Sequence, residues 1–324
     1  MKLLILSNNP TRASFRQRIG VYRDLLKVDG IDSVLERIPK NLVGRWGLYR
    51  QAGGFDAVLL HKKTLNFADA KILRKFARKI IYDFDDAVMY SPKEPGKDKA
   101  SRLRSFARTV GMADLVIAGN VYLAEHAKRY CGNVHVLPTG LDVKRYDITK
   151  SKPADDTIRL VWIGSKSTLR YLEQISSALS QIGRKYSHVV LRVIADAFPE
   201  IPDISIEKVS WSQEHEVDDL ISSDIGLAPL EDDRFTRGKC GFKILQYFSA
   251  GLPCVASPVG MNQDLVLDNK TGILAQTESE WVAALGRLIE DWHLRSTMGT
   301  EGRRTAEEYD LDRIGRQFVK LTGF

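Results

Sequence analysis

The sequence predicts an α/β fold built from two tandem domains, each with a parallel sheet covered by helices. Three observations carry this prediction: short apolar runs alternate with helical stretches along the chain, the alternation occurs in both halves, and a polar stretch separates them. Strands that are separated by helices form parallel sheets with helices on both faces. A chain of 324 residues is long enough for two ordinary domains with sizeable cores.

The first half opens with an apolar run at residues 3–7, which ends in the turn Asn8-Asn9-Pro10 and predicts a first strand. Apolar side chains then recur at helical spacing, at Phe15, Ile19, Tyr22, Leu25 and Leu26. The same patterns predict strands at 57–61, 79–83, 115–118 and 134–137, and helices at 68–77 and 121–130.

The second half repeats the alternation. Strands are predicted at 159–163, 189–195, 225–229 and 253–257, and helices at 168–186, 214–222, 242–250, 278–291 and 301–321. The polar, proline-containing stretch 150–156 predicts a linker, so we expect domains at 1–150 and 151–324. Ligands of such sheets bind beyond the carboxyl ends of the strands, and two domains add a cleft between them.

The positive charge of the chain is concentrated in its first half. The net charge is +7, but residues 1–150 carry 28 Lys and Arg against 15 Asp and Glu, a net of +13, and residues 151–324 carry a net of −6. A half this basic favours an anionic partner. Basic and apolar residues alternate within 71–79 and 93–108, which is typical of a helix on an anionic membrane and equally of an ordinary surface helix. No aromatic-rich recognition motif accompanies these charges, so we expect no nucleic-acid partner.

The cysteines and the apolar runs indicate the cellular compartment in which the protein is expected. Cys131, Cys240 and Cys254 are odd in number and lack paired metal-ligand spacing, which favours a reducing cytoplasm and no metal centre. The apolar N-terminus is short and has no small-residue cleavage site, so it predicts a strand rather than a signal peptide. No apolar run has the length of a membrane span. We expect a cytoplasmic protein whose basic half would meet the inner face of the plasma membrane.

Residues 224–260 carry the most specific pattern: a strand, a basic loop with glycines, a helix and a strand. Gly238 and Gly241 allow the backbone to approach a ligand closely, and the loop opens a helix whose first N–H groups favour an anion. Arg237, Lys239 and Lys243 add full positive charges. Two interpretations are open, a phosphate or diphosphate site and a solvated basic loop.

Three carboxylates, Asp83, Asp85 and Asp86, follow the apolar pair Ile80-Ile81 at a predicted strand end. Such a group can hold a metal, act as a base, bind hydroxyls, or cap the following helix. The pattern also resembles phosphatases of the haloacid dehalogenase type. The Thr and Gly that those enzymes carry near the second Asp do not follow here.

Two more sets of polar residues follow strand ends. His61 ends the strand at 57–61 and is either a site residue or a partly buried, hydrogen-bonded histidine. Arg16 and Arg18 follow the first strand, where they either bind a phosphate bidentately or are solvated at a helix start.

The stretch 224–260 resembles the donor-binding region of retaining glycosyltransferases of family 4, which have the GT-B fold. Members of that family carry a Glu-x-Phe-Gly motif and a second Glu after it, and here Gly238-Lys239-Cys240-Gly241 and Gln246 stand in these places. The Ala-x-Gly-x-Pro-Val-Val-Ala stretch of the family is similar to Ala250-Gly251-Leu252-Pro253-Cys254-Val255-Ala256 here. Further similarities lie at 136–142, 161–168, 209–211, 262–266 and 270–274.

The resemblance implies two Rossmann-like domains facing across a cleft, with a nucleotide-diphosphate sugar held by the second domain and the acceptor at the first. Cations at the departing diphosphate would lower the barrier to transfer. Its implied donor-side residues are Lys239 and Lys243, then Arg237 and Lys166, with Gln246 on the ribose, Trp211 at the nucleobase, and Gly164, Gly238 and Gly241 lining the site. Its implied acceptor-side residues are Asp83 and Asp85, which would contact acceptor or sugar, together with Arg16, Arg18 and His61.

We therefore expect a glycosyltransferase of hexosyl or N-acetylhexosaminyl type, acting with retention on a cell-envelope glycan or a lipid-linked acceptor. No cofactor or metal is expected besides the donor substrate, and a C-terminal helix at about 303–321 is expected to return to the first domain. Two other classes stay open. One is an inactive nucleotide-sugar-binding protein, because Gly238 replaces a Glu, and the other is a phosphatase that uses Asp83 and Asp85.

Overall fold

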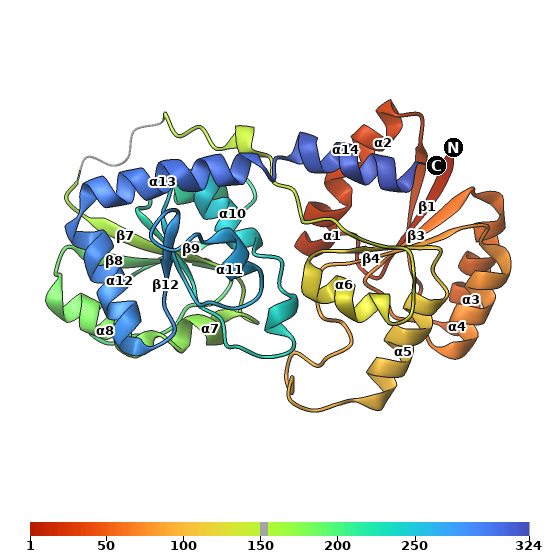
Figure 1. The fold of residues 1–324 in the computed structure, drawn as a ribbon, viewed down its shortest axis with the longest axis horizontal. Coiled ribbons are helices and arrows are strands. Elements are labelled where there is room, and N and C mark those ends of the chain that lie inside the picture. Colours follow the sequence, from red (N-terminus) through yellow and green to blue (C-terminus); the bar gives the residue numbers. More distant parts are fainter. Residues whose placement is uncertain (150–154, 324) are drawn as a thin grey trace. The chain divides into compact units, whose positions relative to one another are not determined.

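The structure, a computed structural model, describes residues 1–149 and 155–323 and divides into two compact units (Figure 1). The first unit comprises Met1–Gly140, Asp233–Cys240 and Leu311–Phe324, and the second unit comprises Leu141–Asp232 and Gly241–Asp310. Residues 150–154 of the expected linker lie outside the described residues.

The first unit is built on a parallel sheet of six strands in the order β2-β1-β3-β4-β5-β6. The strands are β1 (Lys2–Ser7), β2 (Asp32–Arg37), β3 (Ala57–His61), β4 (Ile80–Phe84), β5 (Leu115–Ala118) and β6 (Val134–Val136). The strand order reverses between β1 and β3, and their carboxyl ends, Ser7 and His61, are paired in register. A ligand site of an open α/β sheet is expected at such a reversal.

Helices cover the sheet of the first unit. They are α1 (Ala13–Arg18), α2 (Arg23–Val28), α3 (Leu42–Gln51), α4 (Phe67–Phe76), α5 (Ala100–Gly111), α6 (Val121–Lys128) and α14 (Leu311–Thr322). The C-terminal helix α14 lies beside α2 (Figure 1), and its Phe318 ring stacks on Tyr22 with centroids 4.9 Å apart. Ile314 and Phe318 are thereby buried in the same core as Leu3 and Ile5 of β1.

The second unit is also a parallel six-stranded sheet, in the order β12-β11-β10-β7-β8-β9. Its strands are β7 (Ile158–Ile163), β8 (Val189–Ala195), β9 (Ser205–Ser210), β10 (Ile225–Ala228), β11 (Cys254–Ala256) and β12 (Gly272–Leu274). Counted within the unit, this is the 3-2-1-4-5-6 order of a Rossmann fold, which reverses between β7 and β10.

The helices of the second unit are α7 (Leu169–Glu173), α8 (Ser176–Lys185), α9 (Glu216–Ile221), α10 (Phe242–Ser249), α11 (Met261–Leu265), α12 (Glu278–Glu290) and α13 (Trp292–Glu307). Tyr247 fixes α10 at the reversal, because its hydroxyl donates to the Leu227 carbonyl on β10 and accepts from the Ile163 amide on β7. Gly226 permits this approach, since a Cβ there would lie 2.4 Å from the Tyr247 ring.

The structure confirms the predicted alternation and all the strands placed from apolar runs. Neither β2 nor β9 was predicted. Each lies at an edge of its sheet, carries charged residues and is partly exposed. The helix expected at 168–186 is two helices, α7 and α8. The helix expected at 301–321 is also interrupted, between α13 and α14, where the Tyr309 carbonyl accepts from the Leu141 amide.

The division into units is not the expected cut at residue 150. The first unit ends at Gly140, and it takes in residues 233–240 from the middle of the second half as well as α14. This assignment sharpens the charge asymmetry. By sequence, the segments of the first unit sum to +16 and those of the second to −9.

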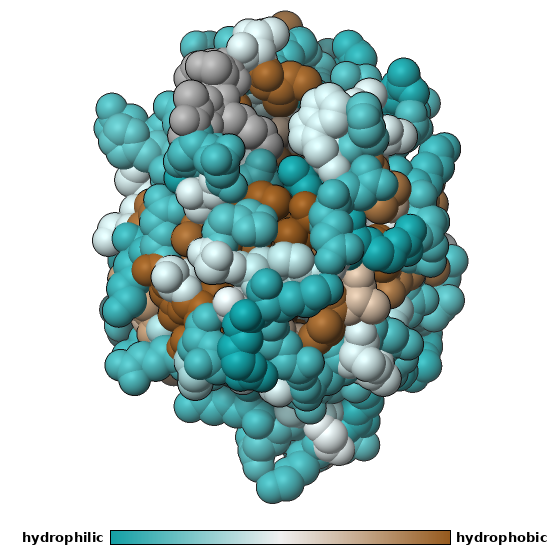
Figure 2. All heavy atoms as spheres, turned by 90° about the vertical axis from the view of Figure 1, so that its left-hand side faces the viewer, coloured by the Kyte–Doolittle hydropathy of each residue, from teal (hydrophilic) through white to brown (hydrophobic). Residues whose placement is uncertain are grey.

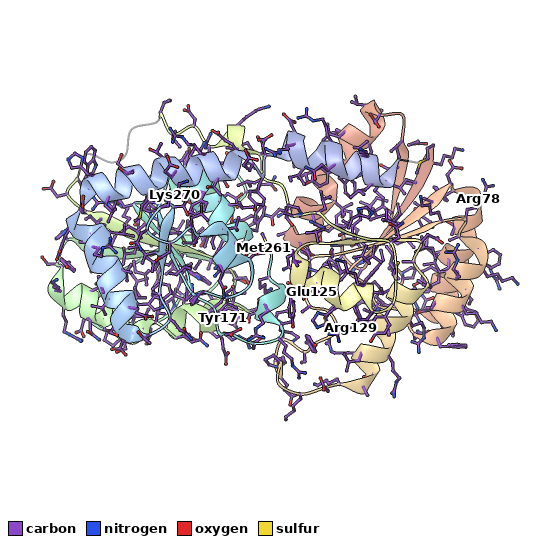
Figure 3. The ribbon with its side chains drawn as sticks, viewed as in Figure 1. Arg78, Glu125, Arg129, Tyr171, Met261 and Lys270 are labelled. Carbon is purple, nitrogen blue, oxygen red and sulfur yellow. The ribbon has the colours of Figure 1, made fainter. Side chains whose placement is uncertain are left out.

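The face of the structure drawn in Figure 2 is mostly hydrophilic. Figure 2 shows one face on which apolar side chains occupy small, separate areas. Arg78 and Arg129 are among the exposed basic side chains of the first unit (Figure 3). None of the helices in the described part of the chain is both long enough and apolar enough to cross a membrane.

Candidate functional site

The carboxyl edge of the second sheet gathers most of the expected donor residues. Gly164 follows β7 directly, at the reversal of strand order, and begins a loop rich in hydroxyl groups. A Cβ on Gly164 would lie 2.3 Å from the Trp162 ring, so only glycine fits there. The Lys166 amide donates to Asp196 at 2.5 Å, which holds the loop, while the Lys166 side chain is exposed.

Lys243 lies in the first turn of α10, and its Nζ is 4.5 Å from the centroid of the buried Trp162 ring. The helix begins at Gly241, whose φ is +64°. A left-handed residue of this kind suits glycine, and a Cβ there would also clash with Leu265. Lys243 therefore adds a full charge to the amide groups at the start of α10, which together favour an anion.

Gln246 lies one turn further along α10 and is buried, beside the phenol of Tyr146. Burial, together with the nearby Glu216 carboxylate, raises the pKa of Tyr146 well above its ordinary value. Trp211 follows β9 and is 37% exposed, and its Nε1 donates to Glu216 at 2.7 Å. This bond fixes an indole with an accessible surface at the same edge of the sheet.

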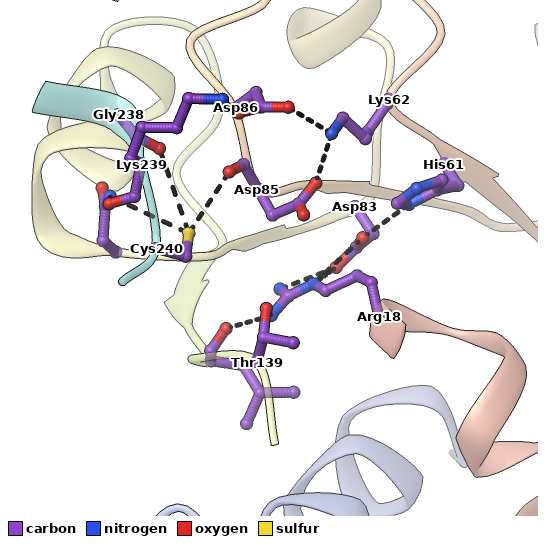
Figure 4. Close-up of polar contacts among 12 residues, drawn as sticks. Arg18, His61, Lys62, Asp83, Asp85, Asp86, Thr139, Gly238, Lys239 and Cys240 are labelled. Carbon is purple, nitrogen blue, oxygen red and sulfur yellow. Dashed lines mark hydrogen bonds and ion pairs between the residues drawn. The ribbon is translucent and has the colours of Figure 1, made fainter. Parts of the chain in front are cut away.

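The first unit holds a separate cluster at the carboxyl ends of β3 and β4 (Figure 4). Asp83 is fully buried, with one oxygen accepting from Arg18 Nη2 at 2.9 Å and the other 2.9 Å from His61 Nδ1. Burial alone would raise the pKa of Asp83, but the Arg18 charge and the His61 hydrogen bond outweigh it and hold the pKa below its usual value. Arg18 also donates to the carbonyl of Leu137.

This burial changes the roles expected for two residues. Arg18 is 2% exposed and Asp83 is 0% exposed, so neither side chain is accessible for direct contact with an acceptor. His61 is buried as well, more deeply than the partly buried histidine that the sequence suggested, and its Nε2 has no hydrogen-bond partner among the described residues. Arg16, by contrast, is only half-buried.

Asp85 and Asp86 remain partly accessible, at 15% and 24% exposure, and Lys62 bridges them. Lys62 Nζ is 2.9 Å from Asp85 and also pairs with Asp86. Burial would lower the pKa of Lys62, but the two carboxylates outweigh it and raise the pKa. The Lys62 backbone has a φ of +56°, which is uncommon outside glycine and often marks functional sites. Lys62 was not among the residues expected in the site, although it follows His61 directly.

The basic loop is divided between the two units. Arg237, Gly238 and Lys239 lie in residues 233–240 of the first unit. Lys243 and Gln246 lie in the second unit. Lys239 Nζ is 2.9 Å from Asp86, and it lies 4.8 Å from the Phe235 ring. Lys239 is thus engaged by a carboxylate of the first unit, while Arg237 is exposed.

Backbone contacts hold the segment 233–240 in the first unit. Asn120 donates to the Lys239 carbonyl at 3.1 Å, and Tyr122 donates to the Arg234 carbonyl at 3.0 Å. Cys240 is buried and its thiol donates to the Asp85 carbonyl. Gly119 makes room for it, because a Cβ on Gly119 would lie 2.4 Å from the Cys240 sulfur.

Acid is expected to weaken the first unit through Asp86. Burial would raise the pKa of Asp86, but Lys239 and Lys62 outweigh it and lower the pKa far below the ordinary value. A carboxyl with a depressed pKa stabilises the fold above its unfolded pKa, and this contribution is lost as the pH falls. Urea unfolding between pH 7 and pH 3 should show a smaller loss of stability in Asp86→Asn than in the wild type. The same substitution at the exposed Asp32 is the control, and equal pH profiles for Asp86→Asn and the wild type would contradict the assignment.

Two parallel α/β units of this topology define the GT-B class of fold, and solved structures of glycosyltransferases share it. The sequence pattern of the family described as glycosyl transferases group 1 matches residues 129–291, just over half of the chain, and the chain belongs to this family. A search of curated proteins finds no match.

Several solved structures resemble the whole chain. HepE of Anabaena, in complex with UDP, aligns with a TM-score of 0.74 at 16% identity over 99% of both chains. Sucrose-phosphate synthase of Thermosynechococcus elongatus aligns with a TM-score of 0.75 at 15% identity, over 99% of this chain and 98% of that one. WaaG, a glycosyltransferase of lipopolysaccharide biosynthesis, aligns with a TM-score of 0.68 at 12% identity over 99% and 100%. At these identities the likeness establishes the fold.

Proposed function

We propose that this glycosyltransferase transfers a hexosyl or N-acetylhexosaminyl group, with retention, from a nucleotide-diphosphate sugar to a cell-envelope glycan or lipid-linked acceptor. The observation that carries the donor assignment is the carboxyl edge of the second sheet. There the reversal of strand order brings the Gly164 loop and the start of α10 together, with Lys243 and Gln246 on one helix. HepE has been solved with UDP and with UDP-glucose, which supports a nucleotide sugar as the donor.

In this proposal the departing diphosphate is stabilised by Lys243 and the N-terminus of α10, with Lys166 on the facing loop. Negative charge grows on the diphosphate as the glycosidic bond breaks, so fixed positive charge at that point lowers the barrier. Trp211 offers an indole face to the base and Gln246 an amide to the ribose. Arg237 and Lys239 are assigned to the first unit, where Asp86 holds Lys239.

The acceptor side is proposed to be the cluster of the first unit. Asp85 and Asp86 are its accessible carboxylates. Asp83, which precedes them, is buried and stabilises the cluster through its contacts with Arg18 and His61. The net charge of +16 on this unit supports an anionic surface, such as a membrane or a phosphate-linked lipid, as its partner. We place the protein at the cytoplasmic face of the membrane on this basis, with no nucleic-acid partner.

The phosphatase alternative has less support. Its metal would need the Asp83 and Asp85 oxygens, but Asp83 is engaged by Arg18 and His61, and Asp85 by Lys62. Cations at this spacing compete with a metal ion for the same carboxylates. Within residues 1–149 and 155–323, no group of three or more metal-ligating side chains is arranged to hold a metal.

The donor proposal is tested by a thermal-shift screen of nucleotide sugars on the whole protein. A ligand that binds only the native state raises the apparent stability, by about 2.7 kcal/mol at a hundredfold excess over Kd. We expect one nucleotide class to raise the melting temperature by several degrees. Lys243→Ala should weaken its binding at least tenfold, because an ion contact to a diphosphate is lost.

Lys270→Ala is the matched control, since Lys270 is an exposed lysine of the same unit (Figure 3). It should bind as the wild type does. The donor assignment would be wrong if no nucleotide shifted the protein, or if Lys243→Ala bound as well as Lys270→Ala. Tight binding without turnover on any acceptor would instead favour an inactive nucleotide-sugar-binding protein.

A further inference from the structure

The second unit contains a cavity that the proposed reaction does not use. Its volume is about 560 Å³, within the range of small-molecule sites. Asp224 and Pro253 line it, and they directly precede β10 and β11. The cavity is therefore at the amino edge of the sheet, the edge opposite to Gly164 and Lys243.

One face of α13 forms the opposite wall, with Trp292, Arg295, Gly299 and Arg303 at helical spacing. Gly299 brings α13 against the backbone, because a Cβ there would lie 2.1 Å from the Gly251 carbonyl oxygen. Arg295 and Arg303 are two turns apart, so their positions span roughly 12 Å along the helix.

The two arginines are bonded to neutral groups. Arg295 donates to the carbonyls of Leu288 and Ile289 at 2.6 and 2.8 Å, and Arg303 donates to the carbonyls of Tyr146 and Ser249. The carbonyls of Leu288 and Ile289 lie in the last turn of α12, and the Ser249 carbonyl lies in the last turn of α10. A cation near the C-terminus of a helix is stabilising. Within the described residues, neither guanidinium is within ion-pair distance of a carboxylate.

The positive charge open to a ligand comes from Arg295 and Arg303. Arg304 also lines the cavity but pairs with Glu301, and the lining carboxylates are Asp224 and Glu307. Asp224 accepts from the Arg159 amide at 2.8 Å. Burial lowers the pKa of both Arg295 and Arg303, and the nearby carboxylates only partly offset this, so an anion would stabilise both charges.

Trp292 supplies a planar apolar surface at the same cavity. It is 62% exposed, one turn from Arg295 on α13. An indole stacks on planar rings, and guanidinium groups bind phosphate oxygens bidentately. We propose that this cavity is a second ligand site, independent of the donor site, which binds a phosphorylated small molecule of the mononucleotide class.

The test is a fluorescence titration of the whole protein with adenosine monophosphate, with inorganic phosphate as the competitor. We expect saturable quenching in the wild type, most of which disappears in Trp292→Phe. Arg295→Gln should raise the Kd at least tenfold, and Arg303→Gln should do the same. Arg184→Gln, which removes an exposed arginine on α8, should leave the Kd within twofold.

The donor-site variant Lys243→Ala separates this proposal from the proposed function. It should leave the Trp292-dependent quenching unchanged, whatever its effect on nucleotide-sugar binding. The second site would be disproved if the wild type gave no saturable quenching, or if Trp292→Phe and Arg295→Gln titrated as the wild type does. Arg295 and Arg303 also bind carbonyls at the ends of α12 and α10, so either variant can lose stability. Trp292→Phe, which breaks neither contact, decides the outcome if the arginine variants fail to fold.

Discussion

Asp83→Ala is expected to lower the free energy of unfolding of the first unit by about 3–5 kcal/mol, the cost of breaking a buried ion pair from one side. Removing the carboxylate leaves Arg18, which is 2% exposed, with a buried and uncompensated charge. It also removes the hydrogen-bond partner of His61 Nδ1. Urea unfolding at pH 7 measures this loss directly.

Asp98→Ala is the matched control for Asp83→Ala. Asp98 also pairs with an arginine, Arg234, at 2.7 Å, but its side chain is 63% exposed. Exposed pairs contribute about 0–1 kcal/mol, so the control should unfold nearly as the wild type does. If Asp83→Ala were as stable as Asp98→Ala and lost only activity, Asp83 would contact the substrate rather than stabilise the buried cluster with Arg18 and His61.

Gly238→Glu is expected to release the segment 233–240 from the first unit instead of restoring the carboxylate of the family motif. A Cβ on Gly238 would lie 2.7 Å from the Ala87 Cβ and 2.8 Å from the Ala87 amide nitrogen. Backbone at that distance cannot yield cheaply, and overpacking of this kind costs about 1–3 kcal/mol. The released segment would also lose the ion pair between Lys239 and Asp86.

Limited proteolysis with trypsin reports on this segment, because Arg237 and Lys239 are cleavage sites within it. Cleavage there should be markedly faster in Gly238→Glu than in the wild type. Gly96→Glu adds the same side chain at an exposed glycine with nothing within 4 Å of the added Cβ, and it should be cleaved as the wild type is. Unchanged cleavage in Gly238→Glu, with higher transfer activity, would contradict the claim that the segment 233–240 is held in the first unit and cannot accept a larger side chain at Gly238.

The core strands could be predicted from the sequence because each is buried on both faces. The strands β1, β3, β4, β7 and β8 appear as near-continuous apolar runs, which is typical of parallel sheets. The edge strands β2 and β9 carry sequences such as Asp-Ser-Val-Leu-Glu-Arg, with charged residues at exposed positions. Their pairing depends on a neighbouring strand and leaves no comparable signal in the sequence.

The candidate site was predictable where it depends on strand ends. His61 ends β3, and Asp83 is paired with it one residue before the end of the neighbouring parallel strand β4, so their proximity follows from the topology. The docking of residues 233–240 depends on contacts distant in sequence, such as Cys240 against Gly119, which no local pattern reveals. The burial of Arg18 is likewise a tertiary effect. Arg18 is the last residue of α1, and it is buried by contacts with Asp83 and Leu137, which are distant in sequence.

Hydrogen exchange of the whole protein, with and without the nucleotide that raises its melting temperature, tests the donor proposal most directly. We expect the nucleotide to slow exchange most in the Gly164 loop and at the start of α10, and we expect Lys243→Ala to abolish this slowing. Two results would contradict the donor proposal. One is slower exchange only at residues 82–87 of the first unit, and the other is the same slowing in Lys243→Ala as in the wild type.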